Sequence, residues 1–203
     1  MSSTDTQARH RVVWELPAGK PDWLFGTGAT RTERSLVWLS VLVAFAAIVA
    51  VSRVNDREWA WWQWALLLVL VVDVVGGVVA NSLGSAKRFY AQEPSAAAGL
   101  RRFALNHVVF AAGHLHLFAV VAAFGIGHWP WAVYWYLACL VSVAAVRSSP
   151  LYLQRAVAAG AMTLAVILGG AVQGPAGLVW LGPVLMLKLV VAHSVTEAPF
   201  RPA

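Results

Sequence analysis

Residues 106–116, which read Asn-His-Val-Val-Phe-Ala-Ala-Gly-His-Leu-His, bring together three of the chain's six histidines. The side chains around them are almost all apolar, as in a segment that crosses a lipid bilayer. Ionisable groups are rare and unfavourable at that depth, so a cluster of them marks a functional site by default. Histidine both transfers protons near neutral pH and binds metal ions. The segment therefore predicts proton or metal chemistry inside the membrane.

Two charged side chains lie at matched depths in other apolar runs. Asp73 is the one acid, and Lys188 the one base, placed well inside the predicted hydrocarbon region, each about 10 Å from the end of its helix. Since either charge alone would be unfavourable in lipid, we expect an ion pair between two helices. The pair either fixes the packing of those helices or acts as a proton- or anion-responsive switch, and the sequence leaves both interpretations open.

The spacing of the histidines limits what they do together. His107 and His114 are about 10.5 Å apart along one face of a continuous helix, too far to chelate one ion. His116 is expected on the other side of that helix. His193, in the last apolar run, lies at about the depth of His107. We therefore predict one polar site in the cytoplasmic half of the bundle, formed by Asp73, Asn81, Asn106, His107, His114, Lys188, His193 and Glu197.

Several kinds of site fit these residues. A metal site would take His107 and His193 with Asp73 or Glu197, a mixed nitrogen and oxygen ligand set. A haem site would take His193 with His107 or His114 as axial ligands from two helices. A proton relay needs only connected polar groups facing the bundle interior, and a structural hydrogen-bond network between helices needs no more.

Two short motifs resemble those of known families. The Gly-His-Leu-His step at residues 113–116 resembles the His-x-His step of haem-copper oxidases and nitric-oxide reductases, which implies a haem within reach, although their other histidine ligands are missing. Residues 73–81 resemble the opening of the CDP-alcohol phosphotransferase motif. There Gly76 and Asn81 replace an aspartate and an arginine, and no aspartate follows later in the chain. Two metal ions cannot be held in this way, so we exclude that activity.

The composition indicates the elements that must position these residues. The chain is 60% hydrophobic and 12% charged, whereas soluble domains carry about 25% charged residues. Six apolar runs are each close to the roughly 20 residues that span a bilayer. We predict an all-α fold, a single bundle of six transmembrane helices joined by short loops. The runs cover residues 35–52, 59–80, 103–125, 129–146, 153–172 and 176–195.

The distribution of basic residues predicts the orientation. The second and fourth loops hold several basic residues, the first has Arg53 and Arg57 beside Asp56 and Glu58, and the third and fifth contain no basic residue. The positive-inside rule therefore favours both termini in the cytoplasm of a plasma (inner) membrane. This gives a polar cytoplasmic segment (1–34), a transmembrane domain (35–196) and a short cytoplasmic tail (197–203). Tryptophans at the opposite helix ends are expected to form an interfacial belt. They are Trp59, Trp61, Trp62, Trp64, Trp129, Trp131, Trp135 and Trp180. The basic residues of the second and fourth loops are Lys87, Arg88, Arg101, Arg102, Arg147 and Arg155.

Three classes of function remain. The net charge of +6 is scattered between apolar runs, which favours the lipid bilayer over nucleic acid as the partner. The single cysteine, Cys139, excludes an internal disulfide and a cysteine-based zinc site. We expect a proton-coupled transporter or permease. The alternatives are a membrane-embedded oxidoreductase that depends on haem or a transition metal, and a non-catalytic subunit that assembles with itself or with a larger membrane complex.

Overall fold

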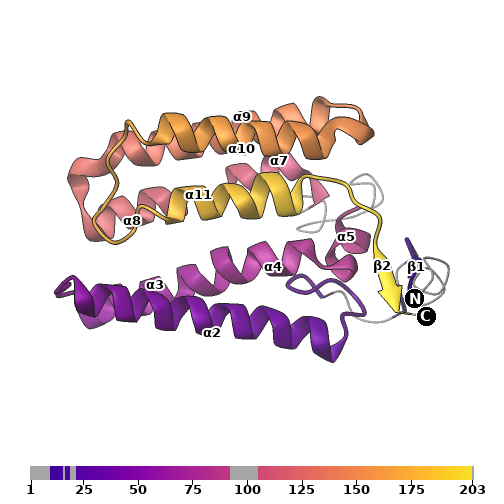
Figure 1. The fold of residues 1–203 in the computed structure, drawn as a ribbon, viewed down its shortest axis with the longest axis horizontal. Coiled ribbons are helices and arrows are strands. Elements are labelled where there is room, and N and C mark those ends of the chain that lie inside the picture. Colours follow the sequence, from indigo (N-terminus) through magenta and orange to yellow (C-terminus); the bar gives the residue numbers. More distant parts are fainter. Residues whose placement is uncertain (1–9, 16, 19–21, 92–104, 203) are drawn as a thin grey trace, which may run out of the picture.

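The computed structural model describes residues 10–15, 17–18, 22–91 and 105–202. They form a helical bundle with one small two-stranded sheet (Figure 1). In chain order the elements are β1 (His10–Val12), α2 (Arg31–Val54), α3 (Trp61–Leu70), the π-helix η1 (Val71–Val75), α4 (Gly76–Ser82), α5 (Gly84–Tyr90), α7 (His107–Ala112), α8 (His116–Phe124), the 3₁₀-helix η3 (Ile126–His128), α9 (Trp129–Ser148), the 3₁₀-helix η4 (Leu151–Leu153), α10 (Gln154–Gly169), α11 (Leu181–Met186), the π-helix η5 (Leu187–His193) and β2 (Phe200–Pro202).

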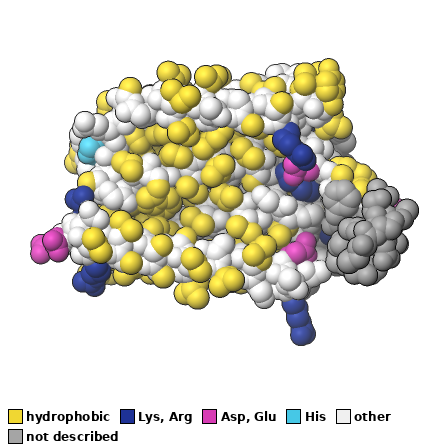
Figure 2. Space-filling view, viewed as in Figure 1, with side chains coloured by type: hydrophobic (Ala, Val, Ile, Leu, Met, Phe, Trp, Pro, Cys, Tyr) yellow, Lys and Arg dark blue, Asp and Glu magenta, His cyan; other side chains and the backbone are white. Residues whose placement is uncertain are grey.

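Within the described part of the chain, five helical stretches are long and apolar enough to cross a membrane. Figure 2 shows apolar side chains over the middle of one face, with the charged side chains gathered toward its two ends. Such a band is what a helical protein presents to lipid. The prediction of a helical fold with helices able to span a membrane is confirmed. The five stretches are Arg31–Val54, Trp61–Ser82, His107–Phe124, Ile126–Ser148 and Leu151–Gly169.

The sixth apolar run is shorter than predicted. Its helix, Leu181–His193, covers about 20 Å, against a hydrocarbon thickness of about 30 Å. Residues 170–180 are not helical, because glycines and a proline interrupt them and Gly177 adopts a positive φ of 82°. This stretch packs into the bundle, where Leu178 is fully buried. Irregular backbone is tolerated at membrane depth when protein covers it.

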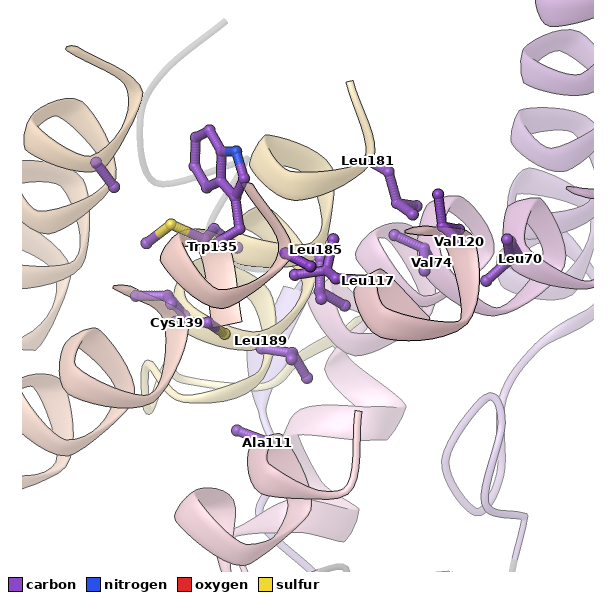
Figure 3. Packing of buried hydrophobic residues seen from close by; sticks show 14 of the residues in the cluster. Leu70, Val74, Ala111, Leu117, Val120, Trp135, Cys139, Leu181, Leu185 and Leu189 are labelled. Atoms are coloured by element: carbon purple, nitrogen blue, oxygen red, sulfur yellow. The ribbon is translucent and has the colours of Figure 1, made fainter. Parts of the chain in front are cut away.

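Two tryptophans predicted for the interfacial belt lie in the core instead. Trp131 and Trp135 are only 1% and 3% exposed, whereas Trp61 is exposed as expected. The indole of Trp135 fits against Gly182, where an added Cβ would lie 2.4 Å from the ring. Figure 3 shows Trp135 in the apolar cluster that joins α9 to the last helix, with Cys139 beneath it. These indoles fill space between helices because glycines leave room for them.

The N-terminal segment is folded where it is described. The first helix begins at Arg31, ahead of the predicted residue 35, because Thr30 and Glu33 form a reciprocal capping box. Phe25 is buried, and its carbonyl accepts a hydrogen bond of 2.5 Å from Ser85 Oγ. Residues 22–30 therefore lie against α5. Arg101 and Arg102 lie outside the described residues.

Segments near both ends of the chain meet at one end of the bundle. Strands β1 and β2 pair antiparallel, with His10 opposite Pro202 and Val12 opposite Phe200 (Figure 1). The last helix runs through the middle of the bundle, with α9 and α10 on one side and α2 and α4 on the other (Figure 1). This central position carries Lys188 into the interior, next to the helix that holds Asp73.

Candidate functional site

Two of the apolar stretches that could span a membrane, and the shorter last helix, depart from regular α-helical geometry around one point. The second contains the π-helix Val71–Val75 around Asp73, and the last contains the π-helix Leu187–His193 around Lys188. The third is broken at residues 113–115, between α7 and α8, at His114. Single π turns inside α-helices occur frequently at functional sites, and broken membrane helices line polar sites. The irregular turns place three ionisable side chains around one point.

The expected ion pair between Asp73 and Lys188 is present. Lys188 Nζ lies 2.7 Å from Asp73 Oδ2 and donates to it. The burial of the two side chains is unequal, at 4% exposed for Lys188 and 40% for Asp73. The lysine therefore depends on its partner far more than the aspartate does, because a buried unpaired charge is strongly unfavourable.

His114 extends this pair into a network. Its Nδ1 lies 2.7 Å from the Phe110 carbonyl oxygen, and its Nε2 lies 2.9 Å from Lys188 Nζ. Since a carbonyl oxygen only accepts, Nδ1 carries the proton, and Nε2 of the neutral ring accepts from the lysine ammonium. Lys188 is thus held between a carboxylate and an imidazole.

His116 belongs to the same network, so the prediction that it faces away is wrong. Its Nε2 lies 3.3 Å from Asp73 Oδ2, and its ring centroid lies 5.2 Å from that of His114. The prediction assumed one continuous helix from His107 onward. The break at residues 113–115 abolishes the regular turn of 100° per residue, which brings His116 round toward Asp73.

A second histidine cluster lies beyond Phe110. The rings of His107 and His193 have centroids 4.5 Å apart, and Phe110 stacks on His193 at 4.4 Å. Phe110 also contacts His114, edge-on, at 4.6 Å. The phenyl ring is thus in contact with both the His107–His193 pair and the Asp73 network. Within the described part of the chain, neither ring nitrogen of His193 has a hydrogen-bonding partner.

The His107–His193 pair lines a cavity of about 370 Å³ at the end of the bundle where β1 and β2 pair. Lys87 lies in its wall and donates to the Ala192 and Val195 carbonyl oxygens at 2.5 and 2.7 Å. Arg147 is also in the wall. The cavity is lined by Lys87, Tyr90, Ala91, Leu105, Asn106, His107, Val108, Arg147, His193, Val195, Thr196 and Glu197.

Burial shifts the pKa values of two side chains at this cavity in the direction that favours their neutral forms. Burial lowers the pKa of Lys87 to about 8, with Glu197 opposing and Arg155 adding to the effect. Burial likewise raises the pKa of Tyr90 to about 12, so its hydroxyl stays protonated and donates to the Trp23 carbonyl at 3.1 Å. The cavity wall therefore offers hydrogen-bond donors across the neutral pH range.

Of the remaining predicted residues, Asn106 and Glu197 lie at the cavity, whereas Asn81 has no contact within the described part of the chain that assigns it to either cluster. Asn106 Oδ1 accepts from the Val109 amide and caps α7 at the cavity rim. Glu197 forms an ion pair of 2.9 Å with Arg155 at the same rim. Asn81 is buried on α4, and no hydrogen-bonding partner for its Nδ2 is present among the described residues. The predicted single site is thus two clusters that both contact Phe110.

Four residues of these clusters were not among those predicted: His116, Lys87, Tyr90 and Arg147. The glycine before His114 was the one signal of a helix break that would have redirected His116. Lys87 and Arg147 were interpreted only as loop charges that set orientation. No local pattern indicates that they turn inward to the end of the last helix. Lys87 and its partner Ala192, for example, are 105 residues apart in the sequence.

The two clusters fit a haem poorly. A haem with two axial histidines lies between their rings, whereas His107 and His193 contact one another and Phe110 stacks on His193. Among the described residues no group of three or more histidine, cysteine, aspartate or glutamate side chains is placed to hold a metal ion. His107 and His193 remain a pair of nitrogen donors without a third ligand.

Comparison with known protein families, with curated proteins and with solved structures gave no match. The chemistry of the site therefore rests on its own geometry.

Proposed function

We propose that this protein is a proton-coupled transporter or permease of the plasma membrane, with Asp73 as its proton-binding group. The observation that carries the proposal is the junction of Asp73, Lys188 and His114 at two π-helices and a helix break. Intramembrane ionisable groups mark proton and substrate pathways, and broken helices line many transporter sites.

The geometry supports a simple cycle. Ionised Asp73 holds Lys188 and faces His116, and Lys188 also contacts neutral His114. A proton that reaches Asp73 removes the carboxylate charge and weakens its hold on Lys188. Lys188 then depends on His114 alone, and the irregular turns let the helices shift with few backbone hydrogen bonds broken. Loss of the proton on the other side of the membrane would restore the pair.

The same proposal includes six membrane crossings with both termini in the cytoplasm. Pairing of β1 with β2 favours an even number of crossings, because segments near both ends of the chain meet at one end of the bundle. With five long helices, the short Leu181–His193 helix must then complete a sixth crossing together with residues 170–180. Lys87, Arg88, Arg147 and Arg155 lie toward that end, which favours it as the cytoplasmic side.

Proton flux into proteoliposomes tests the proposal. A pH-sensitive dye trapped inside should report dissipation of an imposed pH gradient by the wild-type protein, and Asp73→Asn should abolish it. Asp56→Asn is the matched control, since Asp56 is exposed, lies in the loop after α2 and has a positive φ of 49° that asparagine tolerates. Retained flux in a folded Asp73→Asn protein would contradict the proposal.

The membrane oxidoreductase is the second candidate, because the paired imidazoles of His107 and His193 have nitrogens without partners in the described part of the chain. Absorption spectra and metal analysis of the purified protein separate the two. A Soret band, or stoichiometric iron, copper or zinc that is lost in His193→Phe, would favour the oxidoreductase. A third possibility is a non-catalytic subunit of a membrane complex. An Asp73→Asn protein that folds and assembles like the wild type but has lost proton flux would exclude it.

A further inference from the structure

We infer that the cavity between α5, α7, α9 and the end of η5 binds a small oxyanion, a carboxylate or phosphate, as the solute that accompanies the proton. The inference rests on the proposed transport function, because it assigns the substrate class of the same pathway. It depends on the charges, the donors and the position of the cavity.

Charge at the cavity wall is positive. Lys87 and Arg147 both line it, and the one carboxylate among the described lining residues, Glu197, is paired with Arg155 at 2.9 Å. Lys87 is 7% exposed, so its charge is screened little by water. A divalent cation in this cavity would be repelled by both bases, whereas an anion would be attracted by both.

Hydrogen-bond donors also face the cavity without acceptors. Two of the three ammonium N–H groups of Lys87 go to the Ala192 and Val195 carbonyl oxygens, which leaves the third for a ligand. His193 is 3% exposed, and both of its ring nitrogens lack partners among the described residues, as does Nδ1 of His107. Each neutral imidazole carries one N–H donor, and an unsatisfied buried donor is unfavourable by about 1–3 kcal/mol. An oxyanion would accept from all three side chains at once.

Size and position agree with a compact solute. The volume of about 370 Å³ lies at the lower end of the range for small-molecule sites, roughly 300–1,000 Å³. The cavity ends at His193, and Phe110 contacts both this histidine and His114 of the Asp73 network. A bound anion would therefore be connected to Asp73 by contacts through Phe110, His114 and Lys188, a continuous path by which solute and proton binding can be coupled.

Ligand-dependent thermal unfolding of the purified full-length protein in detergent tests the inference. Sodium phosphate and sodium acetate are compared with sodium chloride at equal ionic strength. We expect one of the two oxyanions to raise the Tm saturably where chloride does not, and to slow modification of His107 and His193 by diethyl pyrocarbonate. Short-chain phosphatidic acid against phosphatidylcholine shows whether the oxyanion is a lipid headgroup rather than a free solute.

Variants locate the binding. His193→Phe keeps the ring packing on Phe110 and removes both nitrogens, and Lys87→Gln removes the charge. Each should weaken oxyanion binding roughly ten- to hundredfold, the effect of losing one charged or buried hydrogen bond. Arg57→Gln removes a charge from the exposed loop after α2 and should leave binding unchanged.

The outcomes separate this inference from the transport proposal. No saturable oxyanion effect on either the Tm or histidine modification, or stoichiometric zinc binding in place of an oxyanion, would overturn the inference. Oxyanion binding that persists in Asp73→Asn, together with a wild-type protein that moves no protons, would support the binding site and contradict only transport.

Discussion

The Lys188 side chain reaches Asp73 by passing directly over Gly77. A Cβ added at Gly77 would lie 2.6 Å from Cε and 2.9 Å from Cδ of Lys188. Gly77 stands four residues after Asp73, one turn along the same helix, so the carboxylate and the open surface lie on one face. The ion pair between Lys188 and Asp73 therefore requires a residue without a side chain at position 77.

We therefore predict that Gly77→Ala displaces Lys188 from Asp73. Crowding of this kind is unfavourable by about 1–3 kcal/mol, partly offset by the better helix propensity of alanine. Proton flux should fall strongly, while the Tm in detergent falls by only a few degrees. Gly160→Ala on α10 is the control, because an added Cβ there has no atom within 4 Å. Equal flux in both variants would show that Lys188 need not approach Asp73.

The second prediction follows from the unequal burial of Lys188 and Asp73. Asp73→Asn leaves Lys188 buried without its counter-ion and should lower the free energy of unfolding by about 3–5 kcal/mol. Lys188→Met should be less destabilising, because the Asp73 side chain is 40% exposed and His116 remains beside it. The double variant should recover most of the stability without recovering flux. Strictly additive effects in this cycle would show that the two charges are not coupled.

The sequence predicted this pair because depth along a helix follows from residue count. Asp73 and Lys188 are the charges that lie deep in apolar runs, and a rise of about 1.5 Å per residue gives them matching levels. The same count gave His107 and His193 a common level, and their rings are in contact. A single π-helical turn changes depth along a helix little, so counting residues was enough to align these side chains across the bundle.

Irregular backbone is what the sequence did not reveal. The break at residues 113–115 contains no proline, and it turned His116 toward Asp73 against the expected helical phase. The last helix begins at Leu181 rather than near residue 176 because the preceding stretch folds into the core, a tertiary effect. Lys87 was missed for a related reason, since its inward contacts depend on where the last helix ends.

Lys87 should make stability depend on pH. Its pKa is lowered from 10.5 in the unfolded chain to about 8 in the folded protein, chiefly because it is buried. Between about pH 8 and pH 10.5 the unfolded chain binds more protons, so the free energy of unfolding rises with pH. The neutral amine keeps two N–H donors for the Ala192 and Val195 carbonyl oxygens. Tm measured from pH 7.5 to 10.5 should rise in the wild type and stay flatter in Lys87→Gln; equal slopes would contradict this.

Phe110 should act as the barrier between the two clusters. Its ring contacts both His193 and His114, and the phenyl group has no polar atom that could pass a proton between them. In Phe110→Ala, water filling the vacated space would connect His193 to His114 by hydrogen bonds. We therefore expect an uncoupled proton leak in proteoliposomes without any added oxyanion. Phe118→Ala is the matched control, because Phe118 is a partly buried phenylalanine of the same transmembrane stretch that packs on Trp129 and Tyr136 instead. A leak of equal size in both variants would mean that general loosening of the bundle, and not loss of a barrier at Phe110, lets protons through.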